Sequence, residues 1–379
     1  MIDAVRTARL ARASRYACTL ALLLAATRLA AAPIQDGPYV TPSSKGNLVA
    51  RWVEGDDRAP RVREKSVAVG GTITVPAAGS LPAFNVKLRK PASPVADTVK
   101  LPPGTPLFVM ADSHGEYQIA VELLTKQKVI GPNLKWSFGS GHLAVLGDIF
   151  DRGPNHTEIF WLLYELEAEA KSAGGAVHVM LGNHESMALG GDQRYLNAKY
   201  LKVRDALKAP DYAALWNGSS VLGQWLRTKA AVMKIGDYLC LHGGISAEVV
   251  DRGLDLAQLN AAVRSSLGDA RPDGFVMSPD GPLWYRGYFP DAAREAHSTV
   301  ATASDVGKVL AFFNAKAIFV GHTMVPTVTA LFDGRVIAVQ VYPHRDEASG
   351  KPEMQALLVK RGIFYRARID GTTEPLIPR

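Results

Sequence analysis

Five apolar, strand-like runs of this sequence each end in side chains that are able to hold a metal ion. The candidate metal ligands, in chain order, are Asp112, His114, Asp148, Asn183, His242 and His322. All six offer oxygen or nitrogen atoms, and no thiolate is among them. Such a ligand set suits Mn, Fe or Zn in a reactive site and disfavours a structural zinc site. The sequence therefore predicts a site for divalent metal ions, with Mn as the first expectation and Fe or Zn as alternatives.

Two divalent ions held about 3.5 to 4 Å apart are suited to the hydrolysis of phosphate esters. Such a pair lowers the pKa of a bridging water, so that hydroxide attacks phosphorus, and it neutralises charge on the phosphoryl oxygens. One carboxylate must bridge the two ions, and Asp148, in the middle motif, is the candidate. These ligand types are therefore compatible with a metal-dependent hydrolase.

The spacing of the first three motifs predicts how they are brought together. Asp112 and Asp148 are 36 residues apart, and Asp148 and Asn183 are 35 apart. These intervals are about what one strand, one crossover helix and the loops of a βαβ unit require. The three motifs should therefore emerge at the same edge of one sheet, outside the carboxyl ends of its strands, where ligands bind in open α/β sheets.

The rest of the chain supplies further elements for an α/β fold. Helical spacing of apolar residues predicts helices over residues 116–128, 155–172, 255–267 and 304–314. The sequence predicts a hairpin of strands 231–235 and 238–241, and later strands over 325–331, 336–341, 354–359 and 363–368. Together these elements predict a two-sheet β sandwich flanked by helices on both outer faces.

Composition divides the chain into three parts. Residues 1–31 read as a secretory signal peptide, with a positive n-region, an apolar h-region of 11 residues and a cleavage site after Ala31. Residues 32–104 read as a small β-rich N-terminal extension, and residues 105–379 as the catalytic domain. We therefore expect an exported protein, periplasmic or secreted, without a stable membrane anchor, because 11 apolar residues are too few to span a bilayer.

The charge of the chain does not indicate a nucleic-acid partner. The formal net charge is +7, of which residues 1–31 contribute +4, and no basic stripe with interleaved aromatic residues is visible. Only Cys240 remains after removal of the signal, so an intrachain disulfide is excluded in the mature chain, and we expect this residue to be buried in a strand. The protein is expected to be a monomer that binds a phosphorylated protein or a small phosphoester.

The motifs DSHG, GDIFDRG, GNHE, HGG and GHT, read in this order, resemble those of the calcineurin-like metallophosphoesterases. The resemblance is to the phosphoprotein phosphatase branch, and the GHT motif together with LWYRG at residues 283–287 resembles the bacterial-type Shewanella-like phosphatases. It covers about residues 105 to 342. It implies the αββα fold of that family and phosphorylated Ser, Thr or Tyr as the substrate class.

The resemblance also implies a role for each motif residue. Asp112 and His114 would hold the first metal, and Asn183, His242 and His322 the second, with Asp148 between them. The remaining roles are His184 as general acid, Asp151 as the group that orients it, and Arg152 and Arg286 as clamps on the phosphoryl oxygens. Three neighbours complete the expectations: Glu185 as a carboxylate that supports the ligands or fixes their loop, Arg194 as a border of the substrate site, and His156 as a solvent-facing residue.

Alternative functions are open at this point. An exported scavenging phosphatase for small phosphoesters shares these motifs, and so does a dinucleoside polyphosphate hydrolase. A 5′-nucleotidase is disfavoured, because only 57 residues follow His322, too few for a separate nucleotide-binding domain. A non-catalytic binding module on the same scaffold is a different class of function. It is disfavoured because every motif residue named above is present.

Overall fold

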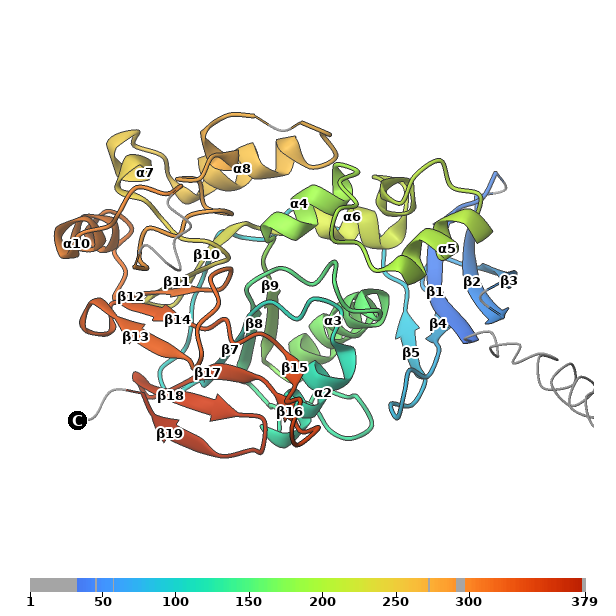
Figure 1. The fold of residues 1–379 in the computed structure, drawn as a ribbon, viewed down its shortest axis with the longest axis horizontal. Helices are drawn as coiled ribbons and strands as arrows, with labels where there is room; N and C mark the ends of the chain where they lie inside the picture. Colours follow the sequence, from blue (N-terminus) through green and yellow to red (C-terminus); the bar gives the residue numbers. More distant parts are fainter. Residues whose placement is uncertain (1–32, 45, 57, 272, 291–296, 377–379) are drawn as a thin grey trace, which may run out of the picture.

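The computed structural model describes residues 33–44, 46–56, 58–271, 273–290 and 297–376. The predicted signal peptide lies outside these residues. Two six-stranded sheets form the centre of the fold (Figure 1). The first sheet has the strand order β19-β18-β17-β7-β8-β9. Its strands are β7 (Leu107–Met110), β8 (His142–Val145), β9 (Ala176–Val179), β17 (Gln355–Lys360), β18 (Ile363–Arg368) and β19 (Thr373–Pro375).

Strands β7, β8 and β9 run parallel to one another, whereas β17 is antiparallel to β7. The carboxyl ends of the three parallel strands therefore lie side by side, as the motif spacing predicts. The crossover helices are α2 (Tyr117–Lys126), between β7 and β8, and α3 (His156–Ser172), between β8 and β9. Each lies within the range that the sequence predicts for it.

The second sheet has the order β13-β14-β12-β11-β10-β6. Its strands are β6 (Thr98–Val99), β10 (Val232–Ile235), β11 (Tyr238–Leu241), β12 (Ala317–Val320), β13 (Thr329–Leu331) and β14 (Val336–Ala338). The predicted hairpin is confirmed, because β10 and β11 pair with Ile235 opposite Tyr238. Strand β13 starts later than predicted because Pro326 has no N–H to donate to a ladder.

The two sheets pack face to face, and the alternation of side chains along β7 shows it. Leu107 and Val109 belong to the apolar layer between the sheets, whereas Phe108 and Met110 belong to the layer beneath the helices. The two-sheet sandwich is thereby confirmed. Cys240 of β11 is fully buried between the sheets, as the sequence predicts.

Helices cover both outer faces of the sandwich (Figure 1). Besides α2 and α3 they are α4 (Asn183–Leu189), α5 (Ala198–Ala206), α6 (Val221–Arg227), α7 (Ala247–Asp251), α8 (Leu256–Ser266) and α10 (Ala303–Phe312). Helix α3 lies against the first sheet, and α7, α8 and α10 lie on the side of the second sheet. None of the helices in the described ranges is long and apolar enough to cross a membrane.

The β-rich N-terminal part packs against α3, α5 and α6 at one end of the molecule (Figure 1). It contains a three-stranded sheet of β1 (Pro33–Pro42), β2 (Leu48–Asp56) and β3 (Ala59–Val67), and the pair β4 (Thr72–Val75) and β5 (Phe84–Lys87). Its last segment supplies β6 of the second sheet, beside β10. The division of the chain near residue 104 stays a prediction.

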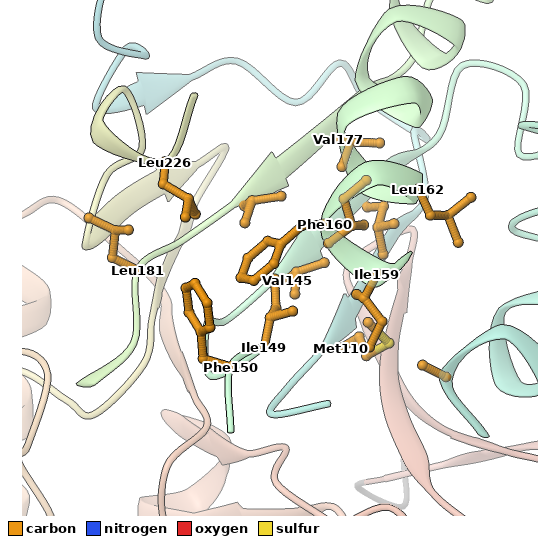
Figure 2. Close-up of a cluster of buried hydrophobic side chains, with 14 of the residues drawn as sticks. Met110, Val145, Ile149, Phe150, Ile159, Phe160, Leu162, Val177, Leu181 and Leu226 are labelled. Carbon is orange, nitrogen blue, oxygen red and sulfur yellow. The ribbon is translucent and has the colours of Figure 1, made fainter. Parts of the chain in front are cut away.

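Helix α3 ties the loop after β8 to the core. Figure 2 shows Ile159 and Phe160 of α3 pointing toward Val145 of β8 and toward Ile149 and Phe150. All five side chains are buried. Ile149 and Phe150 lie within the GDIFDRG motif, so two apolar anchors hold the short segment on which Asp148 and Asp151 are mounted.

Candidate active site

The six predicted metal ligands meet where five strands from the two sheets end. Asp112 and His114 follow β7, Asp148 follows β8, Asn183 begins α4 after β9, His242 follows β11, and His322 follows β12. All six are buried. The Nε2 atom of His242 lies 2.8 Å from Oδ1 of Asn183, 3.1 Å from Nδ1 of His322 and 3.2 Å from Oδ2 of Asp148.

Asp148 belongs to two groups of possible metal ligands. The first group is His114, Asp148 and His184, and the second is Asp148, His242 and His322. Within each group the ligand atoms lie within 4.8 Å of one another. A carboxylate shared by two groups has the position that a bridging ligand requires.

Two predicted residues lie in or beside these groups. The Nε2 atom of His184, the expected general acid, lies 3.8 Å from Oδ2 of Asp148. The Nε2 atom of His114 lies at the same distance from that oxygen. Asp112 is in neither group, although it lines the cavity that members of both groups line. Its carboxylate accepts the backbone N–H of His322 at 3.1 Å and lies 3.7 Å from Nδ1 of His242.

The hydrogen bonds of the histidines test whether the site fits cations. The Nδ1 atoms of His114 and His242 each lie 2.9 Å from a backbone carbonyl, that of Phe150 and of Leu146 respectively. A carbonyl accepts only, so each Nδ1 carries a proton, and in the neutral imidazole that a metal ion requires each Nε2 atom presents a lone pair to the centre. Nε2 of His242 and Oδ1 of Asn183 are then two acceptors 2.8 Å apart. Such a contact is favourable when a cation lies against both, so the residues fit a metal site.

The charges of the cluster point the same way. Burial raises the pKa of Asp148, but the neighbouring His242 and His184 outweigh it and leave the pKa well below its usual range. Burial lowers the pKa of His242, but the charges of Asp148 and Asp112 outweigh it and raise the pKa to about 9. Burial lowers the pKa of His114 to about 3. The pocket therefore holds an ionised carboxylate and favours positive charge beside it.

The loops that bear the ligands adopt unusual backbone conformations. Positive φ angles occur at His114 (42°), Asp148 (52°), Asp151 (70°), Arg152 (61°) and His322 (61°). Non-glycine residues are strained in this region, and such strain persists only where the surroundings fix the chain. These conformations indicate that the site is held rigidly by its neighbours.

Glu185 supplies much of that support. Its two carboxylate oxygens accept four backbone N–H groups, those of Asp148 (2.8 Å), Ile149 (2.8 Å), Phe150 (3.3 Å) and Gly182 (2.7 Å). The side chain thus joins the loop after β8 to the loop after β9. The prediction that Glu185 fixes a loop is confirmed.

Two glycines of the motifs allow the loops after β7 and β8 to touch. A Cβ on Gly115, which has φ +70°, would lie 2.5 Å from the carbonyl oxygen of Gly153. A Cβ on Gly153 would lie 2.5 Å from the carbonyl oxygen of His114. The N–H of Gly153 donates to that same oxygen at 2.7 Å. Side chains at either position would separate the loops and the ligands on them.

His184, Arg152 and Arg286 line the same cavity as most of the metal ligands, and Asp151 contacts His184. Nδ1 of His184 lies 2.6 Å from Oδ2 of Asp151. Burial lowers the pKa of His184, but the charge of Asp148 and the hydrogen bond to Asp151 outweigh it and raise the pKa. Nη1 of Arg286 lies 3.4 Å from the carbonyl oxygen of His322. Arg152 lines the same cavity, which has a volume of about 290 Å³.

The walls of this cavity include further residues besides the metal ligands and the arginines. They are Met187, Tyr195, Trp284, Met324, Gln340 and Tyr342. The guanidinium of Arg152 lies 5.5 Å from the ring of Tyr195 and 5.7 Å from the ring of Tyr342. Arg194, expected at the border of the substrate site, also lines the cavity, where it forms an ion pair with Asp192 at 2.7 Å. An aromatic and apolar wall therefore faces the metal ligands.

The expectation that His156 faces solvent is wrong. Its side chain is fully buried. Its Nε2 atom lies 2.5 Å from the hydroxyl of Tyr212, and its ring stacks on that of Tyr200 with centroids 3.7 Å apart. Segments remote in the sequence cover the start of α3, and helical periodicity within that helix gave no sign of them.

Comparison with known proteins places the chain in a family. The profile of the calcineurin-like phosphoesterases matches residues 105–326, and the chain belongs to that family. Among its relatives, Shewanella-like protein phosphatase 2 of Arabidopsis thaliana is 22% identical over 303 residues, which cover 68% of this chain and 76% of the relative. Shewanella-like protein phosphatase 1 of Plasmodium berghei is 27% identical over 232 residues, 58% of this chain and 62% of the relative.

A solved structure is similar over almost the whole length. The cold-active protein-tyrosine phosphatase of a psychrophilic Shewanella species is 35% identical, with a TM-score of 0.77 over 90% of this chain and 99% of that one. The match extends beyond the family profile into the N-terminal β-rich part. The chain is accordingly a phosphatase, a hydrolase of phosphoric monoesters, in a family that uses a dinuclear metal centre.

Proposed function

We propose that this phosphatase acts on phosphorylated proteins, with phosphotyrosine as its preferred phosphoamino acid. The observation that carries the proposal is the wall of Tyr195, Trp284 and Tyr342 around the cavity that contains the metal ligands and Arg152. Aromatic rings pack edge to face or offset against another ring, which favours an aryl leaving group. The name of the Shewanella relative, a protein-tyrosine phosphatase, supports the same substrate.

The metal-binding residues in this proposal are those that the sequence predicts. Asp112 and His114 would hold one ion and Asn183, His242 and His322 the other, with Asp148 shared, and the pair would supply a nucleophile at neutral pH and neutralise phosphoryl charge. Mn is the proposed metal. Fe and Zn suit the same ligands.

The chain's own residues perform the other steps. Arg152 is a planar fork able to bind two phosphoryl oxygens, and Arg286, which lines the same cavity, binds a third. His184 donates a proton from Nε2 to the leaving oxygen. Asp151 holds the opposite ring nitrogen, Nδ1, at 2.6 Å and thereby orients the ring and stabilises its protonated form.

The alternative that we retain is a scavenging phosphatase for small phosphoesters. It is favoured by the signal-like sequence of residues 1–31, since phosphoproteins are scarce outside the cytoplasm. We propose export as part of this alternative, and we propose that the protein is a monomer.

A substrate panel separates these functions. Metal-stripped mature protein is assayed with and without added Mn on phosphotyrosine and phosphothreonine peptides, p-nitrophenyl phosphate, a nucleoside monophosphate and bis-p-nitrophenyl phosphate. The proposal requires that Mn restore turnover and that kcat/KM be highest for the phosphotyrosine peptide. Preference for the nucleotide would favour the scavenging role. If protein with both metals bound hydrolyses none of the substrates, a binding module would be favoured.

A further inference from the structure

A buried group of charges joins the N-terminal β-rich part to the catalytic region. Asp36 of β1 is fully buried, and its Oδ1 atom lies 2.8 Å from Nζ of Lys199 in α5. The hydroxyl of Tyr39 donates to the other oxygen of Asp36 at 2.6 Å. Nζ of Lys199 also donates to the carbonyl of Gln35 at 3.2 Å and lies 3.9 Å from Glu158 of α3. Burying such a pair costs desolvation energy, so it is weak evidence for stability alone and calls for another explanation.

An irregularity in β1 places Asp36 in this group. Asp36 lies opposite Val53 of β2, and Tyr39 lies opposite Arg51, so β1 has one more residue than its partner strand across this interval. A β-bulge of this kind re-aims side chains. Here both Asp36 and Tyr39 are buried on the side that faces the catalytic region.

Asn197, two residues before Lys199, contacts the backbone of Arg152, the proposed phosphate ligand. Asn197 precedes α5, and its Oδ1 atom accepts the N–H of Lys199 at 3.0 Å. Its Nδ2 atom donates to the carbonyl of Arg152 at 2.8 Å. The N–H of Arg152 donates to the carbonyl of Tyr195 at 2.9 Å. The strained backbone of Arg152, with φ 61°, is therefore held on both sides by the segment just before Lys199.

A second set of hydrogen bonds, made by Tyr200, holds the residues after Arg152. Tyr200 follows Lys199, and its hydroxyl accepts the N–H of His156 at 2.9 Å and donates to the carbonyl of Pro154 at 2.9 Å. Helix α5 thus fixes the whole stretch from Arg152 to His156. Figure 1 shows α5 beside the N-terminal strands β1 and β2.

We propose that the N-terminal β-rich part positions Arg152 for binding of the substrate's phosphoryl group, through Asp36, Lys199 and Asn197. These three are positioning residues, because none of them lines the catalytic cavity. The proposal rests on the proposed function in one respect, the role of Arg152 as a phosphate ligand. It gives the extension a part in substrate affinity that the metal ligands alone do not require.

The first test replaces Asn197 by Ser. Serine keeps the helix cap, since its oxygen accepts the same N–H, but it has no Nδ2 donor for Arg152. Loss of one hydrogen bond is worth about 0.5–1.5 kcal/mol, so we expect the dissociation constant for inorganic phosphate and the KM for p-nitrophenyl phosphate to rise about 2- to 10-fold. Metal content should stay close to that of wild type, and the urea midpoint should fall by no more than the loss of one hydrogen bond explains. Asn217→Ser is the matched control, because Asn217 accepts the N–H of Ser219 in a similar turn and lies outside the cavity.

The second test compares two buried lysines. Lys199→Met breaks the pair with Asp36, and Lys229→Met breaks a pair between a buried lysine and Glu167, which lies outside the catalytic cavity. Both variants should unfold at lower urea concentration. Under conditions in which both are folded, only Lys199→Met should weaken phosphate binding, measured by calorimetry on the Mn-loaded full chain.

The outcomes separate this proposal from the proposed function. Equal phosphate affinity in wild type and Asn197→Ser would overturn the positioning role, as would equal losses in Lys199→Met and Lys229→Met. Should Lys199→Met fail to fold, Asn197→Ser decides alone. Wild type that binds phosphate but hydrolyses no substrate would contradict only the proposed function, because the binding comparison is independent of turnover. Wild type that binds no phosphate would overturn both.

Discussion

Glu185→Gln should weaken the connection between the loops after β8 and β9, which carry Asp148 and Asn183 of the candidate metal site. The carboxylate accepts four buried N–H groups, two on each oxygen, so it is ionised here although burial and the charge of Asp148 raise its pKa. Glutamine has the same shape but a single acceptor oxygen. In either orientation of the amide, two N–H groups lose their partner and face an NH2 group instead.

The size of the effect follows from those two groups. A buried donor without a partner costs about 1–3 kcal/mol, so the variant should lose about 2–6 kcal/mol of unfolding free energy. Asp148 and Asn183 stand on the two loops that Glu185 joins, so affinity for Mn should fall as well. Urea unfolding of the metal-free protein, followed by tryptophan fluorescence, measures the first effect, and metal titration of the folded protein measures the second.

Glu64→Gln is the control for this experiment. Glu64 forms a surface ion pair with Arg51 at 2.6 Å and is 55% exposed, so the same substitution there should cost less than about 1 kcal/mol. The reasoning fails if Glu185→Gln unfolds within the error of Glu64→Gln. It fails also if the variant binds Mn as tightly as wild type does.

Three further predictions concern other parts of the site and its support. His184→Asn should keep both metals and lose about 10²- to 10⁴-fold in kcat, whereas Asp148→Asn should lose metal too, and elemental analysis beside kinetics distinguishes them. Arg152→Lys should raise the KM for p-nitrophenyl phosphate and the Ki for inorganic phosphate, because a single ammonium cannot form two parallel bonds; unchanged constants would remove Arg152 from the phosphate site. Burial lowers the pKa of Lys199, but the charges of Asp36 and Glu158 outweigh it and raise the pKa. The stability that this shift contributes is full below the unfolded pKa of about 10.4 and is lost as pH rises through the folded pKa, so Lys199→Met should flatten the alkaline limb of a stability profile.

The sequence predicts well which residues come together at the candidate metal site, and the reason is physical. Each ligand follows directly on an apolar run that must be a buried strand, so its position along the chain fixes its position at the sheet edge. The βα spacing from Asp112 to Asn183 fixes which edges coincide. The same local signals place α3 after Asn155 and the hairpin around residues 236 and 237.

The features that the sequence could not predict depend on contacts between distant segments. The pairing of Asp36 with Lys199 joins the N-terminal part to α5, and neither residue stands in a recognisable motif. Tyr342 reaches the cavity from a loop in which an aromatic residue carries no positional signal. His156 was misjudged because the periodicity of α3 does not report what covers the start of that helix.

The strand order of the first sheet has a consequence for synthesis of the protein on the ribosome. Strand β7, which leads to the first metal ligands, lies between β8 and β17, and β17 comprises Gln355–Lys360. At roughly 5–20 residues per second, translation takes on the order of 10–50 s to go from one strand to the other. Throughout that time one edge of β7 in the nascent chain has no partner, and an unpaired apolar edge is a template for aggregation. Nascent chains that stop before β17 should therefore depend on chaperones, and the first sheet is complete only when the last strands leave the ribosome.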